Sequence, residues 1–251
     1  MIAEYVVLAV AGLAVGFFIG AVGVGGILLV PALVGLGGVP IHQATATALF
    51  SFLFTGFVGT WLFQRRGSID WTITRPVLAG ALVFSYIGAR VNAMFDAAAL
   101  TLTIAALVAA AGVYLLLPPR HAVARSRDDD HGPRARMSLV CVGALAGFGS
   151  GLSGAGGPLF SVPLMLVLGF APLATVGAGQ VLQIVAALFG TVGNVQFGSI
   201  DYALGGLLVV SETAGMVAGA RAAHGASVRW LRHTAAALCV LAGTLLFMQT
   251  L

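Results

Sequence analysis

The chain alternates between long apolar runs and short polar breaks. A bilayer-spanning helix needs about 20 consecutive, mostly apolar residues. Several runs reach or approach this length: Ile2–Val22, Ile41–Phe63, Pro76–Val91, Ala98–Leu117, Ser138–Gly149, Pro172–Val195, Tyr202–Ala220 and Thr234–Leu251. Only 8% of the 251 residues are charged, whereas soluble domains carry about 25%. The pattern predicts an all-α, multi-pass protein whose main partner is the lipid bilayer of the plasma or inner cell membrane.

The charged residues do not indicate a nucleic-acid partner or a metal site. All twelve basic residues are Arg, and they gather between the apolar runs, which is typical of residues that set membrane topology. His121, His131 and the acidic run Asp128–Asp130 have a spacing that fits no standard metal site. Cys141 and Cys239 each lie inside an apolar run, where a cysteine is expected to pack as a small apolar residue. We predict no metal and no cofactor.

The sequence contains an internal repeat. Three pairs of motifs share an offset of 131 residues: Gly23–Gly26 with Gly154–Gly157, Gly67–Trp71 with Gly198–Tyr202, and Gly88–Arg90 with Gly219–Arg221. We predict two homologous membrane repeats, 1–117 and 138–251, joined by a charged loop, 118–137, and together forming one transport domain. Duplicated halves are common in secondary transporters, whose substrate site lies near the bilayer midplane between the repeats.

The arginines favour one orientation of the halves. With four crossings per half, the halves would be parallel and the arginines would divide eight to four between the two sides. With an odd number, the halves would be inverted, and eleven arginines would lie on one side with one on the other. The positive-inside rule favours the inverted arrangement, with the charged loop in the cytoplasm and both termini outside. The number of crossings stays open.

Glycines interrupt the first apolar segment of each half. Residues 2–36 would form a straight helix of about 52 Å at ~1.5 Å per residue, against a hydrocarbon core of ~30 Å. The helix must therefore break or fold back as a re-entrant hairpin, and glycine accepts the strained backbone angles that this requires. The residues at these two breaks are Gly23, Gly25 and Gly26 in the first half, and Ser153, Gly154, Gly156 and Gly157 in the second.

These glycine breaks predict a site for a small anion. The N–H groups that start the next half-helix carry partial positive charge and bind anions without a basic side chain. The alternative interpretation is that the glycines only permit close helix packing. Uncharged polar residues in later runs extend the predicted substrate site: Thr45, Thr47, Ser51, Gln180 and Gln183. Hydrogen bonding between helices is the alternative role for each of them.

Glu212 is an acidic residue inside the apolar run Tyr202–Ala220. Ionisable groups at membrane depth are costly and are functional candidates by default. We predict that its carboxyl group takes up and releases a proton that is coupled to transport. Sodium is the other coupling ion that the sequence leaves open.

Seven short motifs are distributed over both halves of the chain. The first half has GVGGILLVP from Gly23, ATATA from Ala44, RRGSIDW from Arg65 and YIGAR from Tyr86. The second half has GAGGPLFSVP from Gly154, GSIDY from Gly198 and VAGAR from Val217. In the order and spacing of these motifs the chain resembles the sulfite exporter TauE/SafE family of membrane permeases. The family usually has three consecutive glycines, and here Ile27 and Pro158 replace the third. The second copy also has an extra residue before Pro163.

The resemblance implies transport of sulfite or of another sulfur-containing, organosulfonate or carboxylate anion. A secondary permease that is not an enzyme is therefore the leading hypothesis. The other classes are a membrane-embedded enzyme, a membrane scaffold and a channel. The sequence does not reveal which anion is carried, the direction of transport or the oligomeric state.

Overall fold

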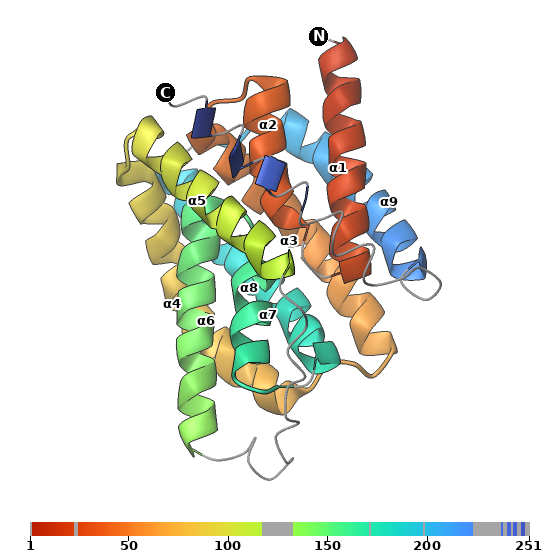
Figure 1. The fold of residues 1–251 in the computed structure, drawn as a ribbon, viewed down its shortest axis with the longest axis vertical. Coiled ribbons are helices and arrows are strands. Elements are labelled where there is room, and N and C mark those ends of the chain that lie inside the picture. Colours follow the sequence, from red (N-terminus) through yellow and green to blue (C-terminus); the bar gives the residue numbers. More distant parts are fainter. Residues whose placement is uncertain are drawn as a thin grey trace.

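The regular elements of this membrane protein are helices throughout the described residues. The computed structural model describes residues 2–22, 25–116, 133–170, 172–197 and 199–222, and seven residues between 237 and 248. The elements, drawn in Figure 1, are α1 (Ile2–Val22), η1 (Gly26–Leu28), α2 (Leu29–Gly37), α3 (Ile41–Arg65), α4 (Trp71–Met94), α5 (Ala97–Leu116), α6 (Pro133–Ser153), α7 (Pro158–Val167), α8 (Pro172–Phe197) and α9 (Tyr202–Ala222). Six of these helices are long and apolar enough to cross a bilayer: α1, α3, α4, α6, α8 and α9. The predicted all-α, multi-pass class is confirmed.

Both predicted breaks are present. In the first half α1 ends at Val22, and the chain resumes as η1 at Gly26 before the 9-residue helix α2. In the second half α6 ends at Ser153, and the 10-residue helix α7 follows from Pro158. Gly154 and Gly156 have φ angles of +67° and +82°, in the left-handed region that favours glycine. Each half therefore places a short helix, too short to span the bilayer, within the helical bundle.

The repeated Gly-Ser-Ile-Asp motif starts a helix in each half. The side chain of Asp70 accepts a hydrogen bond from Thr72 N at 2.9 Å, and Asp201 Oδ1 accepts one from Leu204 N at 2.9 Å. Aspartate is a favoured N-cap because it satisfies an N–H group that the first turn leaves free. The cap explains why α4 begins at Trp71, five residues before the predicted apolar run.

Helix α6 also begins earlier than the sequence analysis expects. It starts at Pro133, inside the segment assigned to the charged loop, so Arg134 and Arg136 lie in its first turn. Proline suits the first position of a helix because its missing N–H has no intrahelical partner there. Most of the loop and most of the last apolar run, Thr234–Leu251, lie outside the described residues.

Helices α1 and α9 pack in parallel. A Cβ atom on Gly16 would collide with the backbone carbonyl of Glu212, and one on Gly20 would collide with that of Met216. The residue numbers of the contacting positions increase along both helices together, so the two helices run in the same direction. Such close approach is possible only because the side facing α9 carries no side chain at these positions.

Helices α4 and α6 form a second parallel pair of the same kind. Gly143 lies against the carbonyl of Val77, and Gly151 lies against that of Ser85. In α6 the glycines facing α4 recur every four residues, at 143, 147 and 151, as they do at 12, 16 and 20 in α1. The two pairs are therefore built in the same way. In each, a stripe of glycines on the first helix of one half (α1 or α6) packs against the fourth α-helix of the other half (α9 or α4).

The two long helices α3 and α8 cross between these pairs in opposite directions. Gly56 of α3 contacts Ile184, whereas Gly59 contacts Gln180, so the contact moves backward along α8. Gly177 of α8 contacts Ser68, just before α4, and Gly193 contacts Ala89 near the end of α4, so α8 runs parallel to α4. Gly205 of α9 contacts Phe50 and Met216 lies against Gly59, so α9 runs parallel to α3. Helices α1, α3 and α9 therefore run one way and α4, α6 and α8 the other, with α1 and α9 on the right of Figure 1 and α4 and α6 on the left.

These directions are the ones expected for inverted repeats. The elements related by the 131-residue offset are α1 with α6, α3 with α8, and α4 with α9. Each of these pairs runs in opposite directions. The homology of the two halves stays a prediction, and the helix directions support it.

The described arginines at helix ends gather on one side of the bundle. Given the helix directions, one end holds Arg65, Arg66, Arg75, Arg134, Arg136 and Arg221, and the opposite end holds Arg90. This asymmetry agrees with the predicted inverted arrangement. The positive-inside rule predicts that the arginine-rich end faces the cytoplasm, and this orientation stays a prediction.

Cysteine labelling is expected to place these two ends on opposite sides of the membrane. In a background without Cys141 and Cys239, Arg66→Cys should react with a membrane-impermeant maleimide only from the cytoplasmic side. Ala98→Cys, exposed in the first turn of α5, should react only from outside, because α5 follows the opposite end of α4. Labelling of both cysteines from the same side would contradict the helix directions described above.

Candidate functional site

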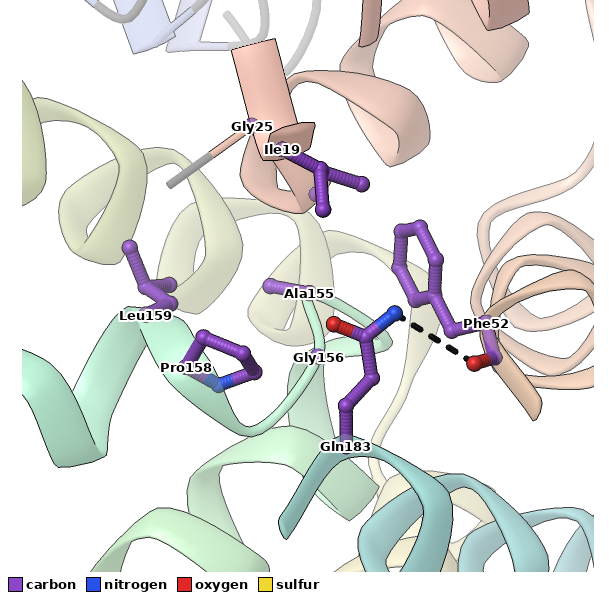
Figure 2. A pocket seen from close by; sticks show the side chains of 9 residues that line it. Ile19, Gly25, Phe52, Ala155, Gly156, Pro158, Leu159 and Gln183 are labelled. Carbon is purple, nitrogen blue, oxygen red and sulfur yellow. Dashed lines mark hydrogen bonds between the residues drawn. The ribbon is translucent and has the colours of Figure 1, made fainter. Parts of the chain in front are cut away.

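The two glycine breaks meet in the interior of the bundle. A Cβ atom on Gly26 would lie 2.6 Å from the carbonyl oxygen of Ala155, which belongs to the other break. Between them lies a small cavity, drawn in Figure 2 and lined by Ile19, Gly25, Gly26, Phe52, Ala155, Gly156, Pro158, Leu159 and Gln183. The structure thus brings together four of the residues that the sequence places in the substrate site: Gly25, Gly26, Gly156 and Gln183.

The aromatic ring of Phe52 lies between the two breaks. The side chain is fully buried, and its ring lies 2.9 Å from a Cβ built on Gly26 and 3.5 Å from one built on Gly156. The remaining cavity has room for about one water molecule. An anion of several atoms enters this site only if the Phe52 ring or one of the breaks moves.

The N-terminal ends of α7 and η1 bring backbone N–H groups to this region. In α7 the N–H groups of Phe160 and Ser161 both donate to the carbonyl of Gly157, at 3.3 and 3.1 Å. Pro158 has no N–H, so Leu159 carries the first amide of α7 that has no partner within the helix. In the first half, the first helical hydrogen bond runs from Leu28 N to Gly25 O, at 3.0 Å. The N–H groups of Gly26 and Ile27 come before it and therefore have no partner within the helix.

Gln183 brings a buried amide group to the cavity from α8. Its Nε2 donates to the carbonyl of Phe52 at 3.3 Å and to Thr55 Oγ1 at 2.9 Å. These two bonds use both hydrogens of the amide nitrogen. Figure 2 shows the amide oxygen turned toward Ala155 and Pro158. The cavity therefore receives a hydrogen-bond acceptor from this side chain.

Glu212 lies close to the cavity but does not line it. The carboxyl group is fully buried where α9 meets α1 and α3. Ser51 Oγ donates to Glu212 Oε1 at 3.0 Å, and Oε2 has no hydrogen-bond partner among the described residues. Ser51 immediately precedes Phe52, so α3 connects the buried carboxyl group to the ring that lines the cavity.

Thr45 belongs to a polar network that connects α3 and α4 to the backbone just before the second break. Asn92 Nδ2 donates to Thr45 Oγ1 at 3.2 Å and to the carbonyl of Leu152 at 2.6 Å, and His42 Nδ1 lies 3.2 Å from Asn92 Oδ1. A Cβ on Gly154 would lie 2.7 Å from Thr45 Cα. Sequence reasoning overlooked Asn92, which lies one residue beyond a predicted apolar run; an uncharged amide beside the repeated Gly-Ala-Arg motif is the signal that could have found it.

Four other predicted residues lie outside the cavity lining. Thr47 Oγ1 accepts a hydrogen bond from Asp201 N at 3.1 Å and so holds the turn before α9. Ser153 Oγ donates to the carbonyl of Gly149 at 2.6 Å and accepts from Ala155 N at 3.3 Å. Gly157 is the N-cap of α7. Gln180 is fully buried against Gly59, and both of its amide atoms are without partners in the described part of the chain.

Gly23, predicted to belong to the first break, lies outside the described residues. Of the residues predicted for the substrate site, two glycines from the first break, one glycine from the second break and one amide side chain therefore line the cavity. Ser51 and Glu212 form a neighbouring buried pair, and Thr45, Thr47 and Ser153 hydrogen-bond to the protein itself.

A comparison with known protein families identifies the family to which the chain belongs. Residues 8–246 match the family model described as sulfite exporter TauE/SafE, which covers nearly the whole chain. The chain belongs to the sulfite exporter TauE/SafE family. It is a multi-pass membrane transporter of the TauE/SafE type.

Curated relatives agree with this assignment. The chain is 28% identical over 208 residues to the "Probable membrane transporter protein YdhB" of Bacillus subtilis, covering 82% of this chain and 85% of that protein. It is 25% identical over 221 residues to "Probable membrane transporter protein YunE" of the same organism, covering 79% and 81%. A third relative, from Methanocaldococcus jannaschii, is "Probable membrane transporter protein MJ0441", 26% identical over 213 residues, covering 76% and 78%. No solved structure gave a significant match.

Proposed function

We propose that this TauE/SafE family member is a secondary permease for a small anion, sulfite or another sulfur-containing, organosulfonate or carboxylate anion. One observation carries the proposal: two glycine breaks, one from each half, meet at a single buried cavity. The family description supplies sulfite as the first candidate substrate. The proposed binding residues are Gly25, Gly26 and Gly156, with Gln183 beside them.

The chemistry of the cavity suits an anion that crosses a membrane. Its lining contains no charged side chain, so the protein does not trap the anion in a strong ion pair. Binding would come from the backbone N–H groups at the N-terminal ends of η1 and α7, where the helix dipole favours negative charge. Broken backbone of this kind occurs at membrane depth only where it is buried in protein or lines a cavity.

The helix arrangement suits alternating access. In transporters with inverted repeats, one repeat or bundle rocks against the other around a fixed central site. Here the breaks of the two halves contact each other through Gly26 and Ala155. A relative movement of the halves would separate these residues and change the space available around Phe52.

Flux measurements in proteoliposomes test the proposal. Purified protein is expected to give saturable uptake of at least one of sulfite, thiosulfate and sulfoacetate, above the uptake of protein-free vesicles. The variant Gly26→Leu with Gly157→Leu should lose this flux while still inserting into the membrane. Absence of flux for all of these anions, from protein shown to be folded, would refute the sulfur-anion assignment.

Glu212→Gln is expected to remove any dependence of flux on a pH gradient. The buried carboxyl group has one hydrogen bond, from Ser51, and no basic partner among the described residues. A charged carboxylate in such a place is costly, so a cycle that binds and releases a proton here would couple proton movement to conformation. The amide keeps the Ser51 hydrogen bond but cannot release a proton.

The measurement compares initial flux with and without an imposed pH gradient in wild type and Glu212→Gln. Ser51→Ala is the matched control, because it removes the hydrogen bond and leaves the titratable group in place. If wild-type flux responds to the gradient and Glu212→Gln responds equally, the carboxyl group is not the coupling site. A sodium gradient applied in the same vesicles tests the other coupling ion.

A further inference from the structure

The orientation of the Gln183 amide is fixed by its neighbours. The carbonyl oxygen of Phe52 lies 3.3 Å from Gln183 Nε2, and a carbonyl oxygen can only accept a hydrogen bond. If the amide were turned over, two acceptors would face each other without a hydrogen between them, and the bond with Thr55 would no longer use the amide nitrogen. The NH₂ group therefore points to α3, and the oxygen Oε1 faces the cavity (Figure 2).

The cavity thus presents two kinds of polar group. Gly26 and Leu159, whose N–H groups have no helical partner, line the cavity, and an acceptor, Gln183 Oε1, comes from α8. Gln183 is only 2% exposed, and no described residue donates a hydrogen bond to its Oε1. A water molecule in the cavity could donate to this oxygen. A ligand that displaces the water keeps the free energy of that hydrogen bond only if it brings a donor of its own.

We infer that the permease binds an oxyanion that carries a single negative charge and one hydroxyl group, and that this hydroxyl donates to Gln183 Oε1. The inference rests on the proposed anion permease and narrows its substrate class. The charged oxygens face the amides of the glycine breaks. A fully deprotonated dianion would place an anionic oxygen against Oε1, and the cavity lining has no basic side chain to compensate the second charge.

The inferred class includes the singly protonated forms of divalent oxyanions. It excludes simple alkanesulfonates, which carry one charge but have no hydrogen to donate. Sites built to hydrogen-bond a particular group reject analogues that lack it, because the buried partner is then left unpaired. Gln183 is therefore the residue that selects the protonation state of the substrate.

Methylphosphonate and methanesulfonate form a matched pair of probes. Both are tetrahedral, with a methyl group and three oxygens, and both carry one negative charge at a pH where methylphosphonate keeps one proton. Apart from the central atom, they then differ by one hydrogen, because methylphosphonate has a hydroxyl group where methanesulfonate has an unprotonated oxygen. We expect methylphosphonate to stabilise the purified protein against thermal unfolding at concentrations about tenfold or more below those needed for methanesulfonate.

Raising the pH until methylphosphonate loses its proton should abolish its advantage. Methanesulfonate does not titrate in this range, so its effect reports any change in the protein itself. Gln183→Met, which keeps an unbranched side chain without an amide, should bind the two probes equally. Thr103→Val on α5, whose hydroxyl donates to the carbonyl of Ala99 in its own helix, should keep the wild-type preference.

The outcomes separate this inference from the function on which it rests. Equal binding of the two probes by wild type, or tighter binding of methanesulfonate, overturns the inference and leaves the anion permease standing. Tighter methanesulfonate binding that requires sodium also overturns it, because the cation would then be the partner of Oε1. If neither probe stabilises the protein and no anion is transported, the proposed function fails and the inference fails with it.

Discussion

Gly215→Ala is expected to destabilise the protein strongly. A Cβ atom at this position in α9 would collide with the backbone carbonyl of Leu13 in α1. A backbone group cannot rotate away as a side chain can, so α1 and α9 would have to separate. Overpacking of a tight interface typically costs about 1–3 kcal/mol, and contact with backbone places this substitution at the upper end of that range. The midpoint of thermal unfolding in detergent should fall clearly.

Gly206→Ala in the same helix is the matched control. Among the described residues, no atom beyond the local backbone of α9 lies within 4 Å of a Cβ built at Gly206, and alanine is favoured over glycine inside a helix by roughly 0.5–1 kcal/mol. The control should therefore unfold at the wild-type midpoint or slightly above it. Equal midpoints for Gly215→Ala and Gly206→Ala would mean that the close packing of α1 on α9 does not limit stability.

The sequence was sufficient to predict the fold class. Apolar runs of bilayer length predicted the membrane helices, because few other structures can place such runs in a folded chain. The first run was recognised as broken from its length alone, and α1 does end at Val22 before the glycines. Helix boundaries were less accurate where capping decides them, as at Asp70 and Pro133, since hydropathy does not detect a cap.

The glycine stripes of α1 and α6 show what periodicity could have added. Glycines at 12, 16 and 20, and again at 143, 147 and 151, are spaced four residues apart, so they fall on one helix face. This spacing is typical of close helix packing in membranes. The sequence analysis considered that role only for the glycines at the breaks, and so it did not anticipate which helices would pair.

The composition of the cavity could be predicted only in part. Glycines at both breaks were expected to meet, since duplicated breaks in transporters face a common site. The contribution of Phe52 was not foreseen, because an aromatic residue in an apolar run has no pattern that separates a cavity lining from a lipid-facing or core position. The role of Thr47 depends on a contact with a distant backbone group, Asp201 N, which one-dimensional spacing does not reveal.

Gly26→Ala is expected to reduce anion flux by about 10-fold or more while leaving a folded protein. The added methyl group would lie 2.6 Å from the carbonyl oxygen of Ala155 and 2.9 Å from the ring of Phe52. It would therefore push the two breaks apart or fill the space in which the anion is proposed to bind. A cost of about 1.4 kcal/mol in the bound state is enough for a tenfold loss of affinity, and overpacking commonly reaches that size.

The measurement is the concentration dependence of flux in proteoliposomes for Gly26→Ala, Gly206→Ala and wild type, at equal amounts of inserted protein. Gly206→Ala should match wild type, because its site is open space on α9. Phe52→Leu combined with Gly26→Ala should recover part of the flux, since the smaller side chain removes one of the two contacts. Wild-type flux from Gly26→Ala alone would show that the anion does not pass between the glycine breaks, and would move the substrate site elsewhere in the bundle.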